Sequence, residues 1–491
     1  MTTISKTSAQ RLTALADRAR AELNMLSFAT KPWVMPKIED GAKMLDVVII
    51  GAGQSGLVVG HALKRHGVTN FVVLDRNRQG YEGVWETYAR NHEIRSPKEI
   101  MGADLGLPSM TIESFYRAKH GDAAWDEIKR IPRTDWMDFL RWYRAIADLP
   151  IRNEVTVADI DYDANGVTIT TKDGETLRTR LVILATGMDG GGGWQTPEII
   201  TRNLPHGRYN HACEVYDVSR FKDKSIGVLG AGAAAFDAAV AALDAGARHV
   251  DLFMRRPQLP MIDVAREIET AGQLNHGHEL SDETKWGLSR FMSGLSQSPA
   301  EHHFYKACSF DNFAMHLGSP WWSVGIEGDM VAIKTPKSQF RFDHVVSATG
   351  VAVDMTRRPE LGKIAKGAAL WRDRFTPPAD DPAPGRLNFP YLNHCYQFTE
   401  REPGTARGIE RIFAFNALAS LSMGGMSAVS ISSHRFGVPR VVAGVTGFLF
   451  REQEQAIIPM LAAYNTPGIV LTDRTREKLG LAVDSALAKA G

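Results

Sequence analysis

The stretch DVVIIGAGQSGLVVGHALKRHG, residues 46–67, decides the fold. An apolar run leads into a turn with Gly51, Gly53 and Gly56 in a G-x-G-x-x-G pattern, and helix-forming residues follow. The first glycine permits the tight turn, the second lets backbone N–H groups approach a pyrophosphate, and the third lets helix and strand pack closely. The start of the helix adds partial positive charge. The stretch therefore predicts a dinucleotide-binding strand–turn–helix unit.

The strand that is expected next supports this interpretation. The sequence FVVLD ends at Asp75, at the distance from the turn where such units place an acidic residue. A carboxylate in this position can accept hydrogen bonds from the hydroxyl groups of an adenosine ribose. The pattern of glycines, strand, helix and acid is much more specific than the glycines alone.

The chain repeats the unit as SIGVLGAGAAAFDAAVAALDAG, residues 225–246, with Gly230, Gly232 and Ala235 in the turn. Here the following strand ends in Arg255 and Arg256, where the first unit has a carboxylate. Arginine suits a ribose that carries a 2′-phosphate, although arginines at a strand end can also simply be solvated. We therefore expect two sites for two different dinucleotides.

Two similar phrases suggest how the domains are connected. LVILATG ends at Gly187 and HVVSATG ends at Gly350, and Gly190–Gly193 follow the first phrase as an expected hinge. The predicted fold class is α/β, with two Rossmann-like domains, the second inserted into the first. The expected parts are a helical extension over 1–44, an outer domain over 45–187 and 351–491, and an inner domain over 188–350.

Composition excludes several classes of protein. The chain has 491 residues with 57 Lys+Arg and 56 Asp+Glu, so no basic excess favours a nucleic-acid partner. Its three cysteines are far apart, which favours a reducing cytoplasm over a disulfide framework. No apolar run predicts a membrane span. The adjacent His302 and His303 are not spaced as metal ligands, so no metal is expected.

Together with the two turns and the two ATG strands, Glu82-Gly83-Val84-Trp85 resembles a motif of the flavin-containing monooxygenases and their Baeyer–Villiger relatives. The resemblance implies FAD at the first turn and NADP(H) at the second. The cofactor-binding residues that it implies are Gly51, Gly53, Gln54, Ser55, Gly56, Asp75, Arg76, Val84, Trp85, Gly187, Gly230, Gly232, Ala233, Ala234, Arg255 and Arg256.

Two features depart from the family pattern. Its diglycine before the tryptophan is here Glu82-Gly83, and its linker fingerprint is incomplete, because Tyr216 falls one place late after His211. These departures disfavour a strict Baeyer–Villiger enzyme, and His211 is expected at a domain contact rather than as a proton donor.

The activity that the resemblance implies is monooxygenation. NADPH would reduce the flavin, and a flavin hydroperoxide would deliver one oxygen atom of O2 to nitrogen, sulfur or a carbonyl carbon of a small molecule. The alternatives are a reductase that passes electrons from NADPH through FAD to a separate acceptor, and a nucleotide-sensing protein without turnover. The substrate and the oligomeric state stay open, a homodimer included.

Arg95 is the candidate catalytic residue. It begins the segment Arg95–Glu99, which resembles the family's segment beside the flavin, in a place where the family has asparagine. A cation there could stabilise negative charge on the flavin or its peroxide, or clamp an acidic substrate. It could instead form a salt bridge with Glu82, Glu93 or Glu99.

Aromatic residues gather over 115–143 and 286–322. Such regions either line an apolar ligand cleft or form the cores of insertions, and the sequence does not separate the two interpretations.

Overall fold

The first glycine turn belongs to a seven-stranded sheet with the order β5-β4-β3-β8-β7-β6, in which β19 also pairs with β8. Val47, Val48 and Ile49 are fully buried, as expected for a parallel strand that is covered on both faces. The strands are β3 (Leu45–Ile50), β4 (Phe71–Leu74), β5 (Ile151–Arg152), β6 (Val157–Tyr162), β7 (Val167–Thr171), β8 (Thr176–Leu184) and β19 (Ile412–Ala414). The pairs β3/β4, β3/β8, β4/β5 and β8/β19 are parallel.

The second turn belongs to a separate, all-parallel sheet with the order β10-β17-β11-β12-β13. Its strands are β10 (Tyr209–His211), β11 (Ser225–Leu229), β12 (His249–Phe253), β13 (Phe313–His316) and β17 (His344–Ser347). The alanine-rich helix after the turn packs on this sheet, because small side chains let its backbone come close. All these strands lie in sequence between β8 and β19 of the first sheet.

The structure describes residues 7–26, 31–99, 102–295, 297–381, 384–425 and 430–481. Its contacts divide the chain into one unit over Met1–Thr446, which holds both sheets, and a second over Gly447–Gly491. The helices are α1 (Ser8–Met25), α2 (Gln54–Arg65), α3 (Ile112–His120), α4 (Asp122–Glu127), α5 (Arg133–Ala147), α6 (Glu198–Thr201), α7 (Ala233–Asp244), α8 (Val264–Ile268), α9 (Ala271–His276), α10 (Asp282–Leu295), α11 (Glu301–Cys308), α12 (Gly362–Gly367), α13 (Trp371–Arg374), α14 (His434–Glu452), α15 (Glu454–Ala462) and α16 (Asp473–Lys478). The remaining strands are β1 (Ile38–Glu39), β2 (Ala42–Lys43), β9 (Gly192–Trp194), β14 (Ser323–Glu327), β15 (Met330–Lys334), β16 (Gln339–Phe342) and β18 (Val351–Val353).

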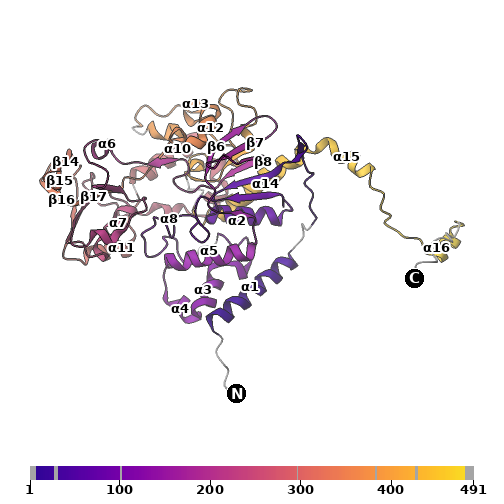
Figure 1. The fold of residues 1–491 in the computed structure, drawn as a ribbon, viewed down its shortest axis with the longest axis horizontal. Helices are drawn as coiled ribbons and strands as arrows, with labels where there is room; N and C mark the ends of the chain where they lie inside the picture. The colour runs from indigo at the N-terminus through magenta and orange to yellow at the C-terminus, as the bar shows by residue number, and fades with distance from the viewer. Residues whose placement is uncertain are drawn as a thin grey trace, which may run out of the picture. The chain divides into compact units, whose positions relative to one another are not determined.

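Helices cover one face of the first sheet in layers. Figure 1 shows α2 against the strands and α5 beyond α2, with α3 and α1 further out. The expected N-terminal helix is α1, whose buried Leu15, Ala16 and Ala19 face the body of the protein. Among the described residues, no helix is both long and apolar enough to cross a membrane.

The connection between the two sheets corrects the hinge interpretation of Gly190–Gly193. A Cβ at Gly190 would collide with the hydroxyl of Thr186, and one at Gly192 would collide with the carbonyl oxygen of Ala352. The outgoing strand β9 pairs antiparallel with the returning strand β18. Gly190 and Gly192 are therefore required for close packing, whereas a Cβ at Gly193 would meet only the side chain of Arg357 at 3.4 Å. The residue boundaries expected for the two domains stay predictions.

The two aromatic-rich regions differ in how deeply their rings are buried. Over 115–143, most rings form a buried core in which Phe115, Trp125 and Trp136 are at most 4% exposed. Over 286–322, Trp286 is buried against Trp371, whereas Phe291, Tyr305 and Trp322 are exposed.

Candidate functional site

The first glycine turn has the geometry that phosphate binding requires. Gly51 has φ +105°, and a Cβ at Gly56 would collide with the carbonyl oxygen of Gly51. Gly53 is the N-cap of α2 and has no side chain that could accept a hydrogen bond from the first N–H groups of the helix. The turn is therefore compatible with a dinucleotide phosphate, and binding by these residues stays a prediction.

Asp75 ties the turn to the end of β4. Its carboxylate accepts hydrogen bonds from the backbone N–H groups of Ala52 (2.7 Å) and Asn77 (2.8 Å). Burial raises the pKa of the Asp75 carboxyl, and these two hydrogen bonds oppose that shift. The residue thus stabilises the turn in addition to the expected role towards a ribose. The neighbouring Arg76 forms an ion pair with Asp189 at 3.6 Å.

The two side chains that follow Gly53 are held by residues far away in the sequence. Trp136 donates a hydrogen bond from Nε1 to Oε1 of Gln54 (3.3 Å), and His434 Nε2 lies 2.9 Å from Oγ of Ser55. Burial lowers the pKa of His434 to about 4, so this histidine is neutral at pH 7. Sequence reasoning missed both partners, since no local pattern marks them.

The expected Glu82–Trp85 segment lies beside the same turn. A Cβ at Gly53 would come within 3.4 Å of Cα of Gly83. Glu82 is buried, where it pairs with Arg144 and accepts a hydrogen bond from the amide of Asn153 (2.7 Å). The departure from the family's diglycine therefore places a paired carboxylate next to the turn.

Trp85, Val84 and Gly187 are further residues that the sequence predicts at the first cofactor. The ring of Trp85 lies 6.4 Å from that of Trp136 in an edge-on arrangement, and Val84 is half-buried beside it. Gly187 has φ +75° and accepts a hydrogen bond from the backbone N–H of Ala417 (3.2 Å).

The second turn is more open. Gly232 caps α7 without a side-chain hydrogen bond, and Ala233 and Ala234 begin the helix. Arg256 donates to the carbonyl oxygens of Gly294 (2.5 Å) and Ser293 (3.3 Å), at the end of α10. Arg255 is exposed and has no hydrogen-bond or ion-pair partner among the residues that the structure describes. Arg255 and Arg256 therefore have different surroundings, although the sequence predicts the same role for both.

Two histidines of the inner part are structural contacts. His211 stacks on Trp194 with ring centroids 5.9 Å apart. The fully buried His303 pairs with Asp237 in the first turns of α7. Over the described ranges, no cluster of three or more His, Cys, Asp or Glu residues could hold a metal ion.

Arg95 does not form any of the three salt bridges that the sequence suggests. It donates to the carbonyl oxygen of Ser298 (3.1 Å) and pairs with Asp263 (3.4 Å), a residue of the inner part. Glu82, Glu93 and Glu99 were the wrong candidates, because sequence distance does not show that 263 lies beside 95.

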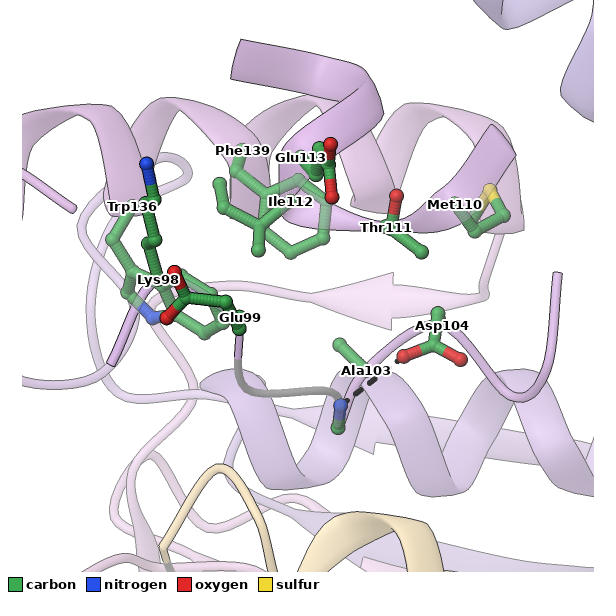
Figure 2. A pocket seen from close by; sticks show the side chains of 11 residues that line it. Lys98, Glu99, Ala103, Asp104, Met110, Thr111, Ile112, Glu113, Trp136 and Phe139 are labelled. Atoms are coloured by element: carbon green, nitrogen blue, oxygen red, sulfur yellow. Dashed lines mark hydrogen bonds between the residues drawn. The ribbon is translucent and has the colours of Figure 1, made fainter. Parts of the chain in front are cut away.

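A cavity of about 150 Å³ begins where the Arg95–Glu99 segment ends. Figure 2 shows Ala103 and Asp104 on one side of it, and Thr111, Ile112 and Glu113 on the other. Trp136 and Phe139 of α5 also line it, so the cavity shares the wall formed by Trp136 with the first site. The full lining is Lys98, Glu99, Gly102, Ala103, Asp104, Met110, Thr111, Ile112, Glu113, Trp136 and Phe139.

Two carboxylates at the cavity already have hydrogen-bond or ion-pair partners within the protein. Asp104 accepts hydrogen bonds from the backbone N–H groups of Gly102 (3.1 Å) and Gly106 (2.8 Å). Glu113 pairs with Arg117 at 2.8 Å. The cavity therefore has an aromatic wall and a polar rim, as small-molecule sites commonly do.

Residues 48–271 match the family described as pyridine nucleotide-disulphide oxidoreductase. The chain is 39% identical over 456 residues to the FAD-dependent urate hydroxylase of Xanthomonas campestris pv. campestris, covering 92% of this chain and 96% of the relative.

Two solved structures share the fold. L-lysine 6-monooxygenase from Pseudomonas syringae matches with a TM-score of 0.63 at 15% identity, covering 82% of this chain and 99% of that one. The bacillithiol disulfide reductase Bdr from Staphylococcus aureus matches with a TM-score of 0.55 at 16% identity, covering 84% and 99%. A monooxygenase and a reductase share this fold, so the fold alone does not distinguish these two functions. The 39% identical hydroxylase favours the monooxygenase. The predicted α/β fold and the predicted resemblance are confirmed.

Proposed function

Since this chain belongs to the family of FAD-dependent monooxygenases that includes the Xanthomonas urate hydroxylase, we propose that it hydroxylates a small oxopurine, with urate as the first candidate. FAD and NADPH are its cofactors and O2 is its second substrate. The observation that carries this proposal is the 39% identity across 96% of the hydroxylase, which includes both glycine turns and the cavity.

The residues of the chain support each part of the reaction. The uncapped start of α2 and Asp75 bind FAD, and the start of α7 with Arg255 binds NADPH. Reduced FAD supplies the oxygen-activating chemistry when bound. The buried Trp136 closes one side of the site, which helps to exclude water from it. One oxygen atom of O2 enters the ring of the substrate, and the other leaves as water at the expense of NADPH.

The location in the cell is part of the proposal. Cys213 and Cys308 form no disulfide bond among the described residues, which is typical of proteins in a reducing compartment. We therefore place the enzyme in the cytoplasm.

The test uses the purified yellow protein with NADPH, air and urate. Urate absorbance, NADPH consumption and hydrogen peroxide are followed together, with isotopically labelled O2 as the oxygen source. We expect urate to stimulate NADPH oxidation and to gain one labelled oxygen atom. Equal NADPH oxidation with and without urate, with all electrons recovered as peroxide, would contradict the substrate assignment. Rapid reduction of an added quinone without O2 uptake would favour the reductase.

A further inference from the structure

Three arginines converge beside the segment that leads into the cavity. Glu93 and Pro132 form an antiparallel bridge, and Ile94 donates to the carbonyl oxygen of Ile131 (2.9 Å). Continuing this register places Arg130 opposite Arg95. Like charges in directly opposed positions repel each other, so this pairing has a cost unless an anion offsets it.

The third arginine comes from the inner part of the chain. Nε of Arg266 lies 3.6 Å from Oδ2 of Asp263, the same oxygen that Arg95 contacts at 3.4 Å. One carboxylate oxygen therefore serves two guanidinium groups. The Glu93 carboxylate lies 3.7 Å from Nδ1 of His302 and forms no ion pair with any of the three arginines among the described residues.

Arg130 differs from Arg95 and Arg266, which both form ion pairs with Asp263. Among the described residues it has no hydrogen-bond or salt-bridge partner. Burial lowers the pKa of Arg130, and Arg266 and Arg95 lower it further, while Glu93 and Asp263 act in the opposite direction. Asp263 and Asp237 act in the same stabilising direction on Arg95. Arg130 therefore adds a guanidinium group whose N–H donors no described residue accepts.

The position of this cluster relates it to catalysis. Ser298, which accepts a hydrogen bond from Arg95, follows Gln297, whose carbonyl oxygen would lie 3.9 Å from a Cβ at Gly232 in the second turn. In the other direction, Arg95 is only three residues from Lys98 on the wall of the cavity. Arg95 is thus connected to the second turn through Ser298 and Gln297, and to the cavity through the segment that ends at Glu99.

We propose that Arg95, Arg130 and Arg266 form an anion site that holds the negative charge of the substrate, a planar heterocyclic monoanion. This rests on the proposed function, since urate is an anion at neutral pH. Guanidinium groups suit this task because they stay charged and present several N–H donors in one plane. The rival occupant is a phosphate of NADPH, for which the second turn already offers uncapped backbone N–H groups.

The experiment compares Arg130→Gln with the wild type and with Arg152→Gln as a matched control. Arg152 is an arginine of β5 that pairs with Glu175 at 2.6 Å. Equilibrium dialysis measures the binding of urate and of hypoxanthine, a neutral oxopurine, to the FAD-loaded protein. Steady-state kinetics measure the KM for NADPH.

We expect Arg130→Gln to weaken urate binding roughly tenfold, the usual effect of losing a charge-assisted hydrogen bond. Hypoxanthine binding and the KM for NADPH should stay unchanged, and Arg152→Gln should match the wild type. A raised KM for NADPH with unchanged urate binding would overturn the inference and assign the arginines to the nucleotide.

The wild type separates the two proposals. If it binds urate with the Arg130 dependence but does not hydroxylate it, the proposed function is wrong and the anion site stands. If it hydroxylates urate and Arg130→Gln binds urate normally, the proposed function stands and the anion site is wrong. If the wild type has no affinity for urate, both are contradicted.

Discussion

The two glycine turns have the same backbone design and very different surroundings. At the first, a buried Asp75 accepts hydrogen bonds from the turn, and His434 and Trp136 hold the next two side chains. At the second, the corresponding strand ends in Arg255, which is exposed and without a partner among the described residues. A site fixed by buried contacts suits a cofactor that stays bound. An open site with a free cation suits one that must arrive, react and leave in every cycle.

The largest effect is expected from Gly56→Ala, since the new Cβ would collide with the carbonyl oxygen of Gly51. We expect a loss of about 3 kcal/mol in the free energy of unfolding, and a protein without flavin. The measurements are the flavin absorbance per chain and urea unfolding.

Ala235 of the second turn gives the matched control, because α7 accommodates a Cβ at the position equivalent to Gly56. Ala235→Gly should cost only about 1 kcal/mol, the difference in helix propensity. Gly56→Ala protein that keeps its full flavin content would show that the first turn is not closely packed.

Acid should weaken the first site through His434. Burial lowers the pKa of His434 from 6.5 to about 4, so the unfolded state binds its proton first as the pH falls. The stability that this neutral histidine contributes is complete above pH 6.5 and is lost between 6.5 and about 4. The loss amounts to about 3 kcal/mol.

His434→Gln keeps a hydrogen-bonding group near Ser55 and removes the titration. Unfolding at several pH values should show a flatter acid limb in this variant than in the wild type. Burial also lowers the pKa of His61 and His344 to about 3, but both proteins share these groups, so the difference isolates His434. Identical pH profiles would refute this role.

Arg255→Ala should change only the second site. We expect the KM for NADPH to rise roughly ten- to a hundredfold, because the 2′-phosphate loses a charge-assisted partner. NADH lacks this phosphate and is the internal control. An equal loss with both cofactors would contradict the assignment.

Arg256→Ala should have the smallest effect on NADPH binding. Its guanidinium already donates to Gly294 and Ser293, so it has less to offer a phosphate. We expect a loss of about 1 kcal/mol in the free energy of unfolding, and a smaller rise in the KM for NADPH than in Arg255→Ala. A larger rise would reverse the roles of the two arginines.

The sequence predicts those features of the fold that depend on local patterns. Gly51, Gly56 and Asp75 could be placed because strand, turn and helix are continuous in the chain. The contacts of His434, Trp136 and Asp263 could not be predicted, since they come from segments that only the folded chain brings together. The glycines at 190–193 were misread because a glycine run signals freedom and close approach equally well. The prediction of a flavin-dependent monooxygenase is confirmed, and the proposed hydroxylation of an oxopurine narrows it further.

The pairing of β19 with β8 has a consequence for synthesis on the ribosome. Ile412–Ala414 completes a sheet whose other strands end at Leu184, so that sheet keeps an open edge while more than two hundred further residues emerge. The inner sheet, which is contiguous from β10 to β17, can form during that interval. Unpaired strand edges promote aggregation. We therefore expect a nascent chain that stalls before β19 to depend on chaperones, and its yield to fall when they are limiting.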